Sequence, residues 1–385
     1  MLKKIIIGVL AVVVLLTVAG GLYVASVIET RPEEAPAVTS VTYVDTYAPA
    51  GAAAADWLET LYHEHTVPSV SAAVGINGQL VWAGVIGYTD IKVLHAARLT
   101  STYRVGSISK SLTGAAVMRL VENRQIELDA SVNTYVPDYA DGKADYTIRQ
   151  LLSHQAGIRS YSSDIAELFS FKTYTSTREA ATITENDPLQ FTPGTGYEYT
   201  TYGYTVLALA MEGATGRPYE QIMYEEVLKP TGMSLTHVYR ADALVKPAKP
   251  YMLISGALIE APEDNISYKH AGGGYVSTPS DLVRFGNGLL SSAFLSSASR
   301  DAMWTQVPFA NGAVNPHKYG LGFQVGEGAQ GRYAYHGGTA NGTYSFLLVY
   351  PDTGVVVALA SNYMPTGNGF DRLAEAERLA ALFRQ

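Results

Sequence analysis

The clearest pattern along the chain is a pair of apolar segments on either side of an Asn-Gly dipeptide. Residues 70–76 and 79–86 are rich in Val, Ile, Ala and Gly, and Asn77-Gly78 separates them. An Asn-Gly pair between apolar runs favours a two-residue β-turn, because both residues tolerate the positive φ that such turns require. We therefore predict a β-hairpin over 70–86.

Further strands are predicted near the C-terminus. Four apolar or alternating runs, separated by turn-forming stretches, cover residues 321–325, 332–336, 344–350 and 355–361. Residues 370–384 instead carry apolar side chains at helical spacing, and residues 52–65 are also expected to be helical. Strands are thus expected at both ends of the chain.

The middle of the chain has a different character. Residues 106–270 read as helical and loop-rich. Sheets and helices bury their apolar faces against one another in a small number of layered arrangements. We therefore predict an α+β fold in which an antiparallel sheet, built from both chain ends and flanked by helices, carries an inserted, mostly helical lobe.

The N-terminus carries an uninterrupted apolar run. Lys3 and Lys4 precede residues 5–28, which contain no charged residue. As a helix this run would be about 36 Å long, enough to cross a bilayer, whereas a cleaved signal usually has about 7–15 apolar residues. Lysines before the run favour an extracytoplasmic body. We expect 1–28 to be a transmembrane anchor with the body periplasmic or extracellular; cleavage near 24–26 and secretion is the alternative.

Two further boundaries follow from composition. Residues 29–50 are rich in Pro, Ala, Thr and Glu without a clear period, and we interpret them as a linker. Residues 51–385 are then long enough for one large two-lobed domain or for two smaller ones.

Charge and cysteine content exclude several classes. The net charge is −8 and there is no cysteine. We therefore expect no nucleic-acid partner, no disulfide and no thiol nucleophile. His63-Glu64-His65 suggests a metal at first sight, but alternate residues on a helix point their imidazoles apart, and the chain has no His-Glu-x-x-His. We expect neither a metal nor another cofactor.

The candidate chemistry begins at Ser107-Ile108-Ser109-Lys110, at the start of a helix predicted over 107–122. Residues three apart on a helix share a face, with Cβ atoms about 5–6 Å apart. A serine hydroxyl becomes a good nucleophile when a neighbouring base takes its proton, and Lys110 lies in position to do so. Because such a tetrapeptide is also expected by chance, its context decides the interpretation.

Three other segments supply that context. They read Leu-Leu-Ser-His-Gln-Ala-Gly-Ile at 151–158, Phe-Thr-Pro-Gly-Thr-Gly-Tyr-Glu-Tyr-Thr-Thr-Tyr-Gly-Tyr at 191–204, and Tyr-His-Gly-Gly-Thr at 335–339. In order and spacing, together with Ser-x-x-Lys, they resemble the class C β-lactamase-like family of serine hydrolases. That family includes D-alanyl-D-alanine carboxypeptidases, esterases and LACTB-type mitochondrial peptidases. The resemblance covers about 52–384, so 51–385 is expected to be one β-lactamase-like catalytic domain.

The resemblance implies a role for each motif residue. Ser107 is the expected nucleophile and Lys110 its partner. Tyr199 matches the tyrosine of the family's Tyr-x-Asn motif and would share proton transfer with Lys110. His336 matches the lysine of the family's Lys-Thr-Gly motif, and it would add positive charge or donate a hydrogen bond to Tyr199 or to substrate.

Substrate contacts are implied in the same way. The backbone N–H groups of Ser107 and Thr339 would form the oxyanion hole, which can supply several kcal/mol of transition-state stabilisation. Gly337 and Gly338 let the opposing strand approach substrate closely because neither has a Cβ. Thr201 stands where the family often has Asn, and its hydroxyl is expected to bind substrate.

The departures at Thr201 and His336 decide the expected substrate. Both weaken the grip expected on a β-lactam, and both resemble the LACTB-type peptidases. We expect a serine hydrolase acting through an acyl-serine on a small peptide or amide, with D-amino-acid or cell-wall peptides favoured. The alternatives are an esterase, a β-lactamase or a catalytically silent binding or scaffold protein. Which of Lys110 and Tyr199 acts as base stays open at this point, since both need a shift of about 3 pKa units.

Overall fold

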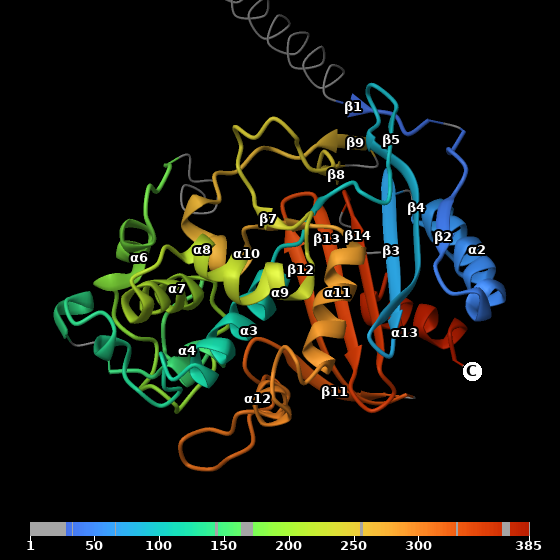
Figure 1. The fold of residues 1–385 in the computed structure, drawn as a ribbon. Helices are drawn as coiled ribbons and strands as arrows, with labels where there is room; N and C mark the ends of the chain where they lie inside the picture. The colour runs from blue at the N-terminus through green and yellow to red at the C-terminus, as the bar shows by residue number, and fades with distance from the viewer. Residues whose placement is uncertain are drawn as a thin grey trace, which may run out of the picture.

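An eight-stranded antiparallel sheet forms the centre of the molecule. The structure, a computed structural model, describes residues 28–384 except 33, 66, 143–144, 163–171, 255–256, 329 and 364–369. The strands follow one another in the spatial order β11 (Gln324–Gly328), β12 (Gly331–Ala340), β13 (Thr343–Tyr350), β14 (Val355–Ser361), β3 (Ser69–Ile76), β4 (Gln79–Asp90) and β2 (Thr39–Thr42), with β5 (His95–Ala96) on β4. N-terminal β3 therefore pairs with C-terminal β14, and the predicted sheet from both chain ends is confirmed (Figure 1).

Two small sheets accompany the large one. The first has the order β1 (Ile28–Glu29), β9 (Ala257–Glu260) and β8 (Tyr251–Ile254). The second has the order β6 (Tyr103–Arg104), β10 (Tyr275–Ser277) and β7 (His237–Val238). Because β7, β8 and β9 fall within 106–270, the inserted lobe is less purely helical than the sequence predicts.

Helices cover both faces of the large sheet. Helices α2 (Ala48–Glu64) and α13 (Arg372–Leu382) pack on one face and α11 (Pro279–Leu290) on the other (Figure 1). Strands β3, β13 and β14 are consequently buried along their whole length. This is why their sequences are apolar runs without the alternation of a sheet that faces water on one side.

The remaining helices belong mainly to the inserted lobe and its junction with the sheet. They are α3 (Ile108–Glu122), α4 (Ile148–Leu152), α6 (Thr177–Glu185), α7 (Tyr202–Thr215), α8 (Tyr219–Met223), α9 (Lys229–Thr231), α10 (His270–Gly273) and α12 (Ser297–Met303). Short 3-10 turns are η1 (Asp45–Tyr47), η2 (Val132–Thr134), η3 (Tyr139–Gly142) and η5 (Ser267–Lys269), and η4 (Tyr224–Leu228) is π-helical.

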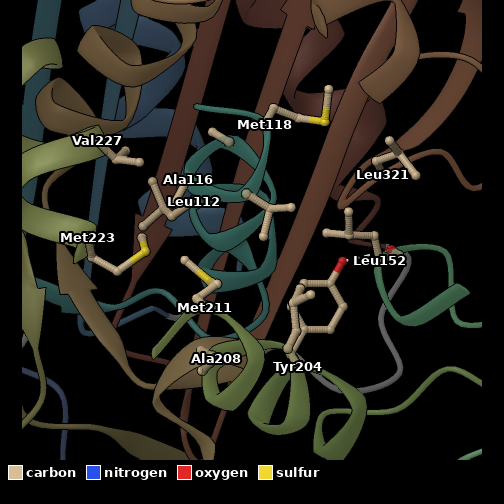
Figure 2. Close-up of a cluster of buried hydrophobic side chains, with 14 of the residues drawn as sticks. Leu112, Ala116, Met118, Leu152, Tyr204, Ala208, Met211, Met223, Val227 and Leu321 are labelled. Carbon is tan, nitrogen blue, oxygen red and sulfur yellow. Dashed lines mark hydrogen bonds between the residues drawn. The ribbon is translucent and has the colours of Figure 1, made fainter. Parts of the chain in front are cut away.

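Helix α3 is the core of that lobe. Leu112 and Ala116 are completely buried, and the cluster around them includes Tyr204 and Met211 from α7 (Figure 2). The Tyr204 hydroxyl donates to the Leu152 carbonyl at 2.8 Å, which joins α7 to the end of α4. A helix surrounded on all sides is apolar all round, and it holds the residues at its start rigidly.

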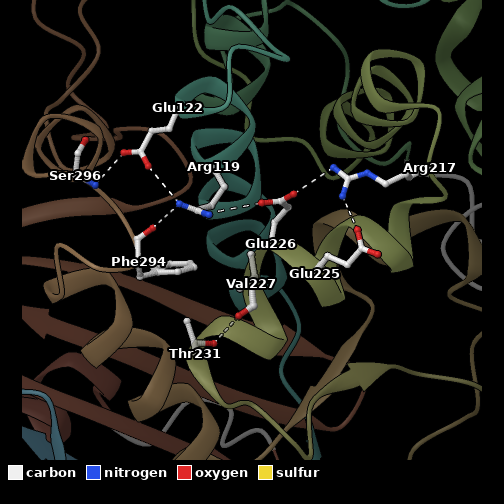
Figure 3. Close-up of polar contacts among 9 residues, drawn as sticks. All are labelled: Arg119, Glu122, Arg217, Glu225, Glu226, Val227, Thr231, Phe294 and Ser296. Atoms are coloured by element: carbon white, nitrogen blue, oxygen red, sulfur yellow. Dashed lines mark hydrogen bonds and ion pairs between the residues drawn. The ribbon is translucent and has the colours of Figure 1, made fainter.

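Ion pairs fix the far end of α3. Arg119 Nη1 donates to the Phe294 carbonyl at 3.0 Å, and its Nε lies 3.8 Å from Glu226 Oε2. Glu226 Oε1 accepts from Arg217 Nη2 at 3.2 Å, so one carboxylate joins two arginines (Figure 3). Glu122 Oε1 accepts from the Ser296 N–H at 2.8 Å. The network links α3 to η4 and to the segment before α12.

The predicted hairpin and terminal strands agree closely with the structure. Asn77 and Gly78 have φ of 50° and 83°, as a turn between β3 and β4 requires. Strand β14 has the predicted bounds. Strand β11, predicted over 321–325, begins instead at Gln324, because Gly322 has a φ of 82° and interrupts extended backbone.

The segment interpreted as a linker is partly built into the body. Within 29–50, Thr39–Thr42 forms the edge strand β2 on β4, and α2 begins at Ala48. The anchor predicted over 1–28 lies outside the described residues apart from Ile28. No helix in the described part of the chain combines the length and the hydrophobicity needed to cross a membrane.

Candidate active site

Ser107 is the N-cap of α3 and lies where that helix meets β12. Gly106, with a φ of 50°, turns the chain from β6 into the helix. A Cβ on Gly106 would lie 2.6 Å from the Thr339 carbonyl oxygen and 2.7 Å from its nitrogen, so only glycine allows α3 to begin against β12. The serine and the end of the Tyr-His-Gly-Gly-Thr segment, far apart in sequence, are thereby brought together.

Lys110 lies beneath Ser107 and is fully buried. Its Nζ donates to the Gly272 carbonyl at 2.6 Å, to Ser107 Oγ at 3.3 Å and to Thr201 Oγ1 at 3.3 Å. Gly272 belongs to α10, and a Cβ there would lie 2.6 Å from the Thr201 methyl. The glycine-rich run at 271–274 can therefore pack closely enough for the Gly272 carbonyl to accept a hydrogen bond from Lys110.

Burial lowers the pKa of Lys110 to about 7, and the positive charge of Lys269 contributes in the same direction. No carboxylate of the described residues forms an ion pair with Lys110. The amine is therefore neutral in a large part of the molecules at neutral pH, and it lies within hydrogen-bond distance of the serine hydroxyl. That combination is what a general base for serine activation requires.

Tyr199 lies beside both Ser107 and Lys110. Burial of its hydroxyl raises the pKa of Tyr199 above its ordinary value, and a hydrogen bond with Ser107 opposes that rise. Its ring lies 4.7 Å from Lys110 Nζ, although 36% of the residue is exposed to solvent. The lysine contacts the ring face rather than the phenol oxygen, so it does not turn Tyr199 into a phenolate. The phenol stays protonated and is able to donate.

His336 is in β12 but is not a cation facing substrate. Burial, reinforced by the charge of Lys110, lowers the pKa of His336 to about 3. Its Nδ1 lies 2.7 Å from the Gly337 carbonyl and its Nε2 lies 2.9 Å from the Tyr319 hydroxyl. A neutral ring satisfies both contacts when Nδ1 donates and Nε2 accepts. The expected positive charge and hydrogen bond to Tyr199 are therefore not available, and His336 supports the wall of the site.

His154 is a second neutral imidazole near Ser107, packed between Tyr199 and Tyr319. Its Nδ1 accepts from the Thr200 N–H at 3.2 Å, and its ring packs 4.4 Å from that of Tyr199 and 4.7 Å from that of Tyr319, measured between centroids. Burial holds the pKa of His154 well below its usual value. The sequence analysis identified neither Tyr319 nor the contact of His154 with Tyr199, because both depend on packing between distant segments.

The backbone N–H of Thr339 lies on the edge of β12 that faces away from β13. Asn341 and Gly342 form a two-residue turn between Ala340 and Thr343, which pair with each other. Residues flanking such a turn form a hydrogen-bonded pair and the pairs then alternate, so the Thr339 N–H points away from β13. Strand β11 ends its pairing at Tyr335 and leaves this N–H uncovered. Its position beside the start of α3 fits the predicted oxyanion hole.

Arg372 is a site residue that the sequence analysis missed. It is the first residue of α13, and its Nη1 donates to the Gly338 carbonyl and to Thr339 Oγ1, both at 3.1 Å. No carboxylate of the described residues lies within ion-pair distance of it, and burial lowers its pKa. In the sequence, Arg372 is recognisable only as a residue at the start of a helix. Its contact with β12 arises because β12, β13 and β14 pair side by side, so that α13, which follows β14, lies near β12. A guanidinium without a carboxylate partner is well suited to bind an anionic group.

The described residues hold no group of three His, Asp or Glu side chains that would ligate a metal. His63, from the His-Glu-His sequence, instead has its Nδ1 3.3 Å from the Arg31 guanidinium. His65 packs its ring 4.9 Å from that of Phe370. These contacts explain both imidazoles as surface packing at the end of α2.

The antiparallel sheet, the inserted lobe and a serine–lysine pair at their junction define the serine β-lactamase and penicillin-binding-protein class of fold. Residues 54–382 match the family described as Beta-lactamase. The chain belongs to that family, and the resemblance stated from its motifs is confirmed.

Named relatives agree with this assignment. The chain is 26% identical to the human serine beta-lactamase-like protein LACTB, mitochondrial, over 81% of this chain and 76% of the relative. It is 27% identical to the putative penicillin-binding protein PbpX of Bacillus subtilis, over 70% of this chain and 64% of that protein.

Solved structures extend the comparison. A D-stereospecific amidohydrolase from Streptomyces sp. has a TM-score of 0.67 at 26% identity, with 81% of this chain and 94% of that chain covered. The D-amino acid amidase from Ochrobactrum anthropi SV3 has a TM-score of 0.72 at 22% identity, with 85% and 97% covered, and shows likeness of fold.

Proposed function

We propose that this protein is a serine peptidase or amidase that acts through an acyl-serine intermediate. The observation that carries the proposal is the buried Lys110 amine 3.3 Å from Ser107 Oγ, with a pKa lowered to about 7. A buried lysine of this kind is unusual as a structural residue, because burying a charge is costly unless it is paired. As a base it has the protonation state that the chemistry needs.

Acylation follows from these positions. Ser107 Oγ attacks the substrate carbonyl carbon while its proton passes to the neutral Lys110 Nζ. The N–H groups of Ser107 and Thr339 stabilise the oxyanion. The Tyr199 hydroxyl, which hydrogen-bonds with Ser107, donates its proton to the leaving nitrogen, and the C–N bond breaks to release the amine. The proton taken up by Lys110 then restores the phenol. Water then attacks the carbonyl carbon of the acyl-serine while its proton passes to the neutral Lys110 Nζ. The C–O bond to Ser107 breaks, the proton returns from Lys110 to Ser107 Oγ, and the acid is released.

Arg372 favours a substrate that carries a carboxylate. Its guanidinium touches the Gly338 carbonyl and the Thr339 hydroxyl on the edge of β12, where an extended substrate would lie beside the oxyanion donors. Together with relatives named as a D-stereospecific amidohydrolase and a putative penicillin-binding protein, this supports removal of a C-terminal residue from D-amino-acid peptides. A free C-terminal carboxylate that can pair with Arg372 distinguishes this substrate class from simple esters.

The proposed location is outside the cytoplasm, with residues 5–28 as a membrane anchor. The support is the uncharged apolar sequence of this run and the lysines before it. Cell-wall peptides are accessible from that side of a membrane.

A panel of substrates tests the proposal. Detergent-solubilised full-length protein is incubated with an N-acylated D-Ala-D-Ala dipeptide, its L,L diastereomer, its C-terminal amide and a p-nitrophenyl ester, each in parallel with Ser107→Ala. Ser107-dependent release of D-Ala, fastest with the free carboxylate, is the expected result. Ester turnover alone would make the protein an esterase, and rapid opening of an added penicillin would make it a β-lactamase. Absence of turnover and of any acyl adduct would leave the scaffold alternative.

A further inference from the structure

One end of the molecule gathers the start of the described chain with elements distant in sequence. Strand β1 pairs with β9, so Ile28 and Glu29 are fixed on the small sheet β1-β9-β8. Residues 90–95, the last residue of β4, the turn 91–94 and the first residue of β5, lie beside it, as Figure 1 shows for β1, β5 and β9. Lys249 Nζ joins the two by ion pairs with Asp90 Oδ2 at 3.0 Å and Glu260 Oε2 at 3.2 Å. We call β1, β8, β9 and the 90–95 turn the rim.

The rim exposes several apolar side chains to solvent. Val93 and Leu94, at the tip of the turn, are 70% and 57% exposed, and Ile28 is 39% exposed. Met252 and Ile259 on β8 and β9 are only half-buried. Single exposed apolar residues are ordinary, but here several gather on one surface. Lys92, next to Val93, is close enough to interact electrostatically with Glu29 of β1.

We propose that the rim docks against the lipid bilayer that residues 5–28 cross. The inference rests on the proposed anchor. Ile28 is both the last residue of the apolar run and the first residue of β1, so no spacer separates the two. Consecutive Cα atoms are about 3.8 Å apart, and the small sheet therefore begins at the bilayer surface. Val93 and Leu94 then enter the boundary between headgroups and acyl chains, while the Lys92 ammonium stays among the phosphates.

Docking also orients the active site. The turn after β12 packs on the rim, because a Cβ on Gly342 would lie 2.6 Å from Ala261 Cβ and the Tyr251 N–H donates to the Gly342 carbonyl at 3.3 Å. Thr339 lies two residues before that turn. The end of β12 that receives substrate is thus held toward the membrane, which suits peptides presented at a bilayer surface.

The absence of cysteine from the chain makes a direct test possible. Val93→Cys and Leu94→Cys are labelled with an environment-sensitive fluorophore in the full-length protein and reconstituted into vesicles of phosphatidylethanolamine and phosphatidylglycerol. Val314→Cys is the matched control, since Val314 is 76% exposed on the loop between α12 and β11, far from β1 in Figure 1. Turnover of a chromogenic ester and thermal unfolding show that each labelled variant is folded.

The expected result is a blue-shifted emission at 93 and 94 with several-fold stronger quenching than at 314. Quenching should be stronger from nitroxides at headgroup level than from nitroxides deep in the acyl chains, since interfacial side chains enter only about 5–10 Å. Equal, water-like signals at all three positions would overturn the proposal. A blue shift without quenching by either lipid would overturn it in favour of a protein partner. Alkaline extraction distinguishes failure of the proposed anchor from failure of the proposed docking. Release of the protein from the vesicles would contradict the anchor, whereas retention without quenching would contradict only the docking of the rim.

Discussion

Ser107 lies between two sides of one site that differ in access to solvent. The closed side consists of Lys110, His154 and His336, all of them almost completely buried. The open side consists of Thr339, which is exposed, and Arg372, which is half-buried at the start of α13. Burial keeps the titratable groups of the closed side largely uncharged, whereas the open side keeps a cation within reach of substrate.

The difference shows that protonation and recognition come from separate elements. Helices α3, α7 and α10 surround the base, and β12 and α13 provide the oxyanion donor and the guanidinium. Substitutions on the closed side should therefore change the rate and its pH dependence. Substitutions on the open side should change which substrates are accepted.

The largest effect is expected from Lys110→Met. Loss of a general base lowers kcat/KM by about 10²–10⁴. The upper part of that range applies here because Ser107 has hydrogen bonds to Lys110 and Tyr199 but none to a described carboxylate or imidazole that could replace the amine. Lys110→Arg is the control, since a guanidinium keeps the positive charge but does not give up its proton. Both variants should be nearly inactive toward the D-Ala-D-Ala substrate. Substantial activity in Lys110→Arg would show that Lys110 acts as a charge and that the base lies elsewhere.

The same variant should change how stability depends on pH. The pKa of Lys110 is about 7 in the folded protein and about 10.4 in an unfolded chain. Between these values the unfolded chain binds more protons, so the free energy of unfolding rises with pH. Lys110→Met removes this titration. Relative to wild type, the variant should lose roughly 2–3 kcal/mol between pH about 6 and pH about 9. Urea unfolding at both pH values measures it, and a difference independent of pH would show that the lysine is not neutral in the folded state.

On the open side, Arg372→Gln should raise KM for the free-carboxylate peptide. A hydrogen bond to a charged group contributes about 1.5–3 kcal/mol, which corresponds to about 10- to 150-fold. The C-terminal amide of the same peptide is the matched control, and its turnover should change little. Arg372→Lys should fall between wild type and Arg372→Gln. An equal loss on both substrates would mean that Arg372 only supports the backbone of β12.

A smaller effect is expected from Thr201→Val, at the border of the two sides. The Thr201 hydroxyl accepts from Lys110 Nζ at 3.3 Å and so favours the charged amine. Its removal should shift the acid limb of the pH–rate profile to lower pH and change kcat/KM only a few-fold, since a single such bond contributes about 1 kcal/mol. Thr201→Ser should behave as wild type. A shift to higher pH would contradict the assigned contact.

Local patterns in the sequence predicted much of the fold. The Asn77-Gly78 turn and the strands around it required only nearest-neighbour chemistry. The short strands β1 and β2 were not predicted, because each has only a few residues and forms by pairing with a strand that the chain adds later. Propensity alone does not indicate such pairings.

In the site, the residues of the sequence motifs were predicted, but the contacts that depend on tertiary packing were not. Ser107, Lys110 and Tyr199 carry a recognisable motif, and the structure brings them together with Thr339. Of the two roles given for His336, positive charge or hydrogen-bond donation, the first does not fit its burial, which depends on how β12 packs against Tyr319. Arg372 was missed because a lone arginine at a helix start has no local signature. The pKa of His336 and the position of the Arg372 guanidinium depend on tertiary packing, so no short segment of sequence predicts them.

The most direct test of the central claim is the rate at which Ser107 becomes acylated as a function of pH. Full-length protein and Ser107→Ala are treated with a fluorophosphonate, and the adduct is followed by intact mass. If neutral Lys110 is the base, only the wild-type chain gains the adduct, and the rate rises through an apparent pKa of about 7. No adduct at any pH, or a rate that does not change across this range, would contradict the account.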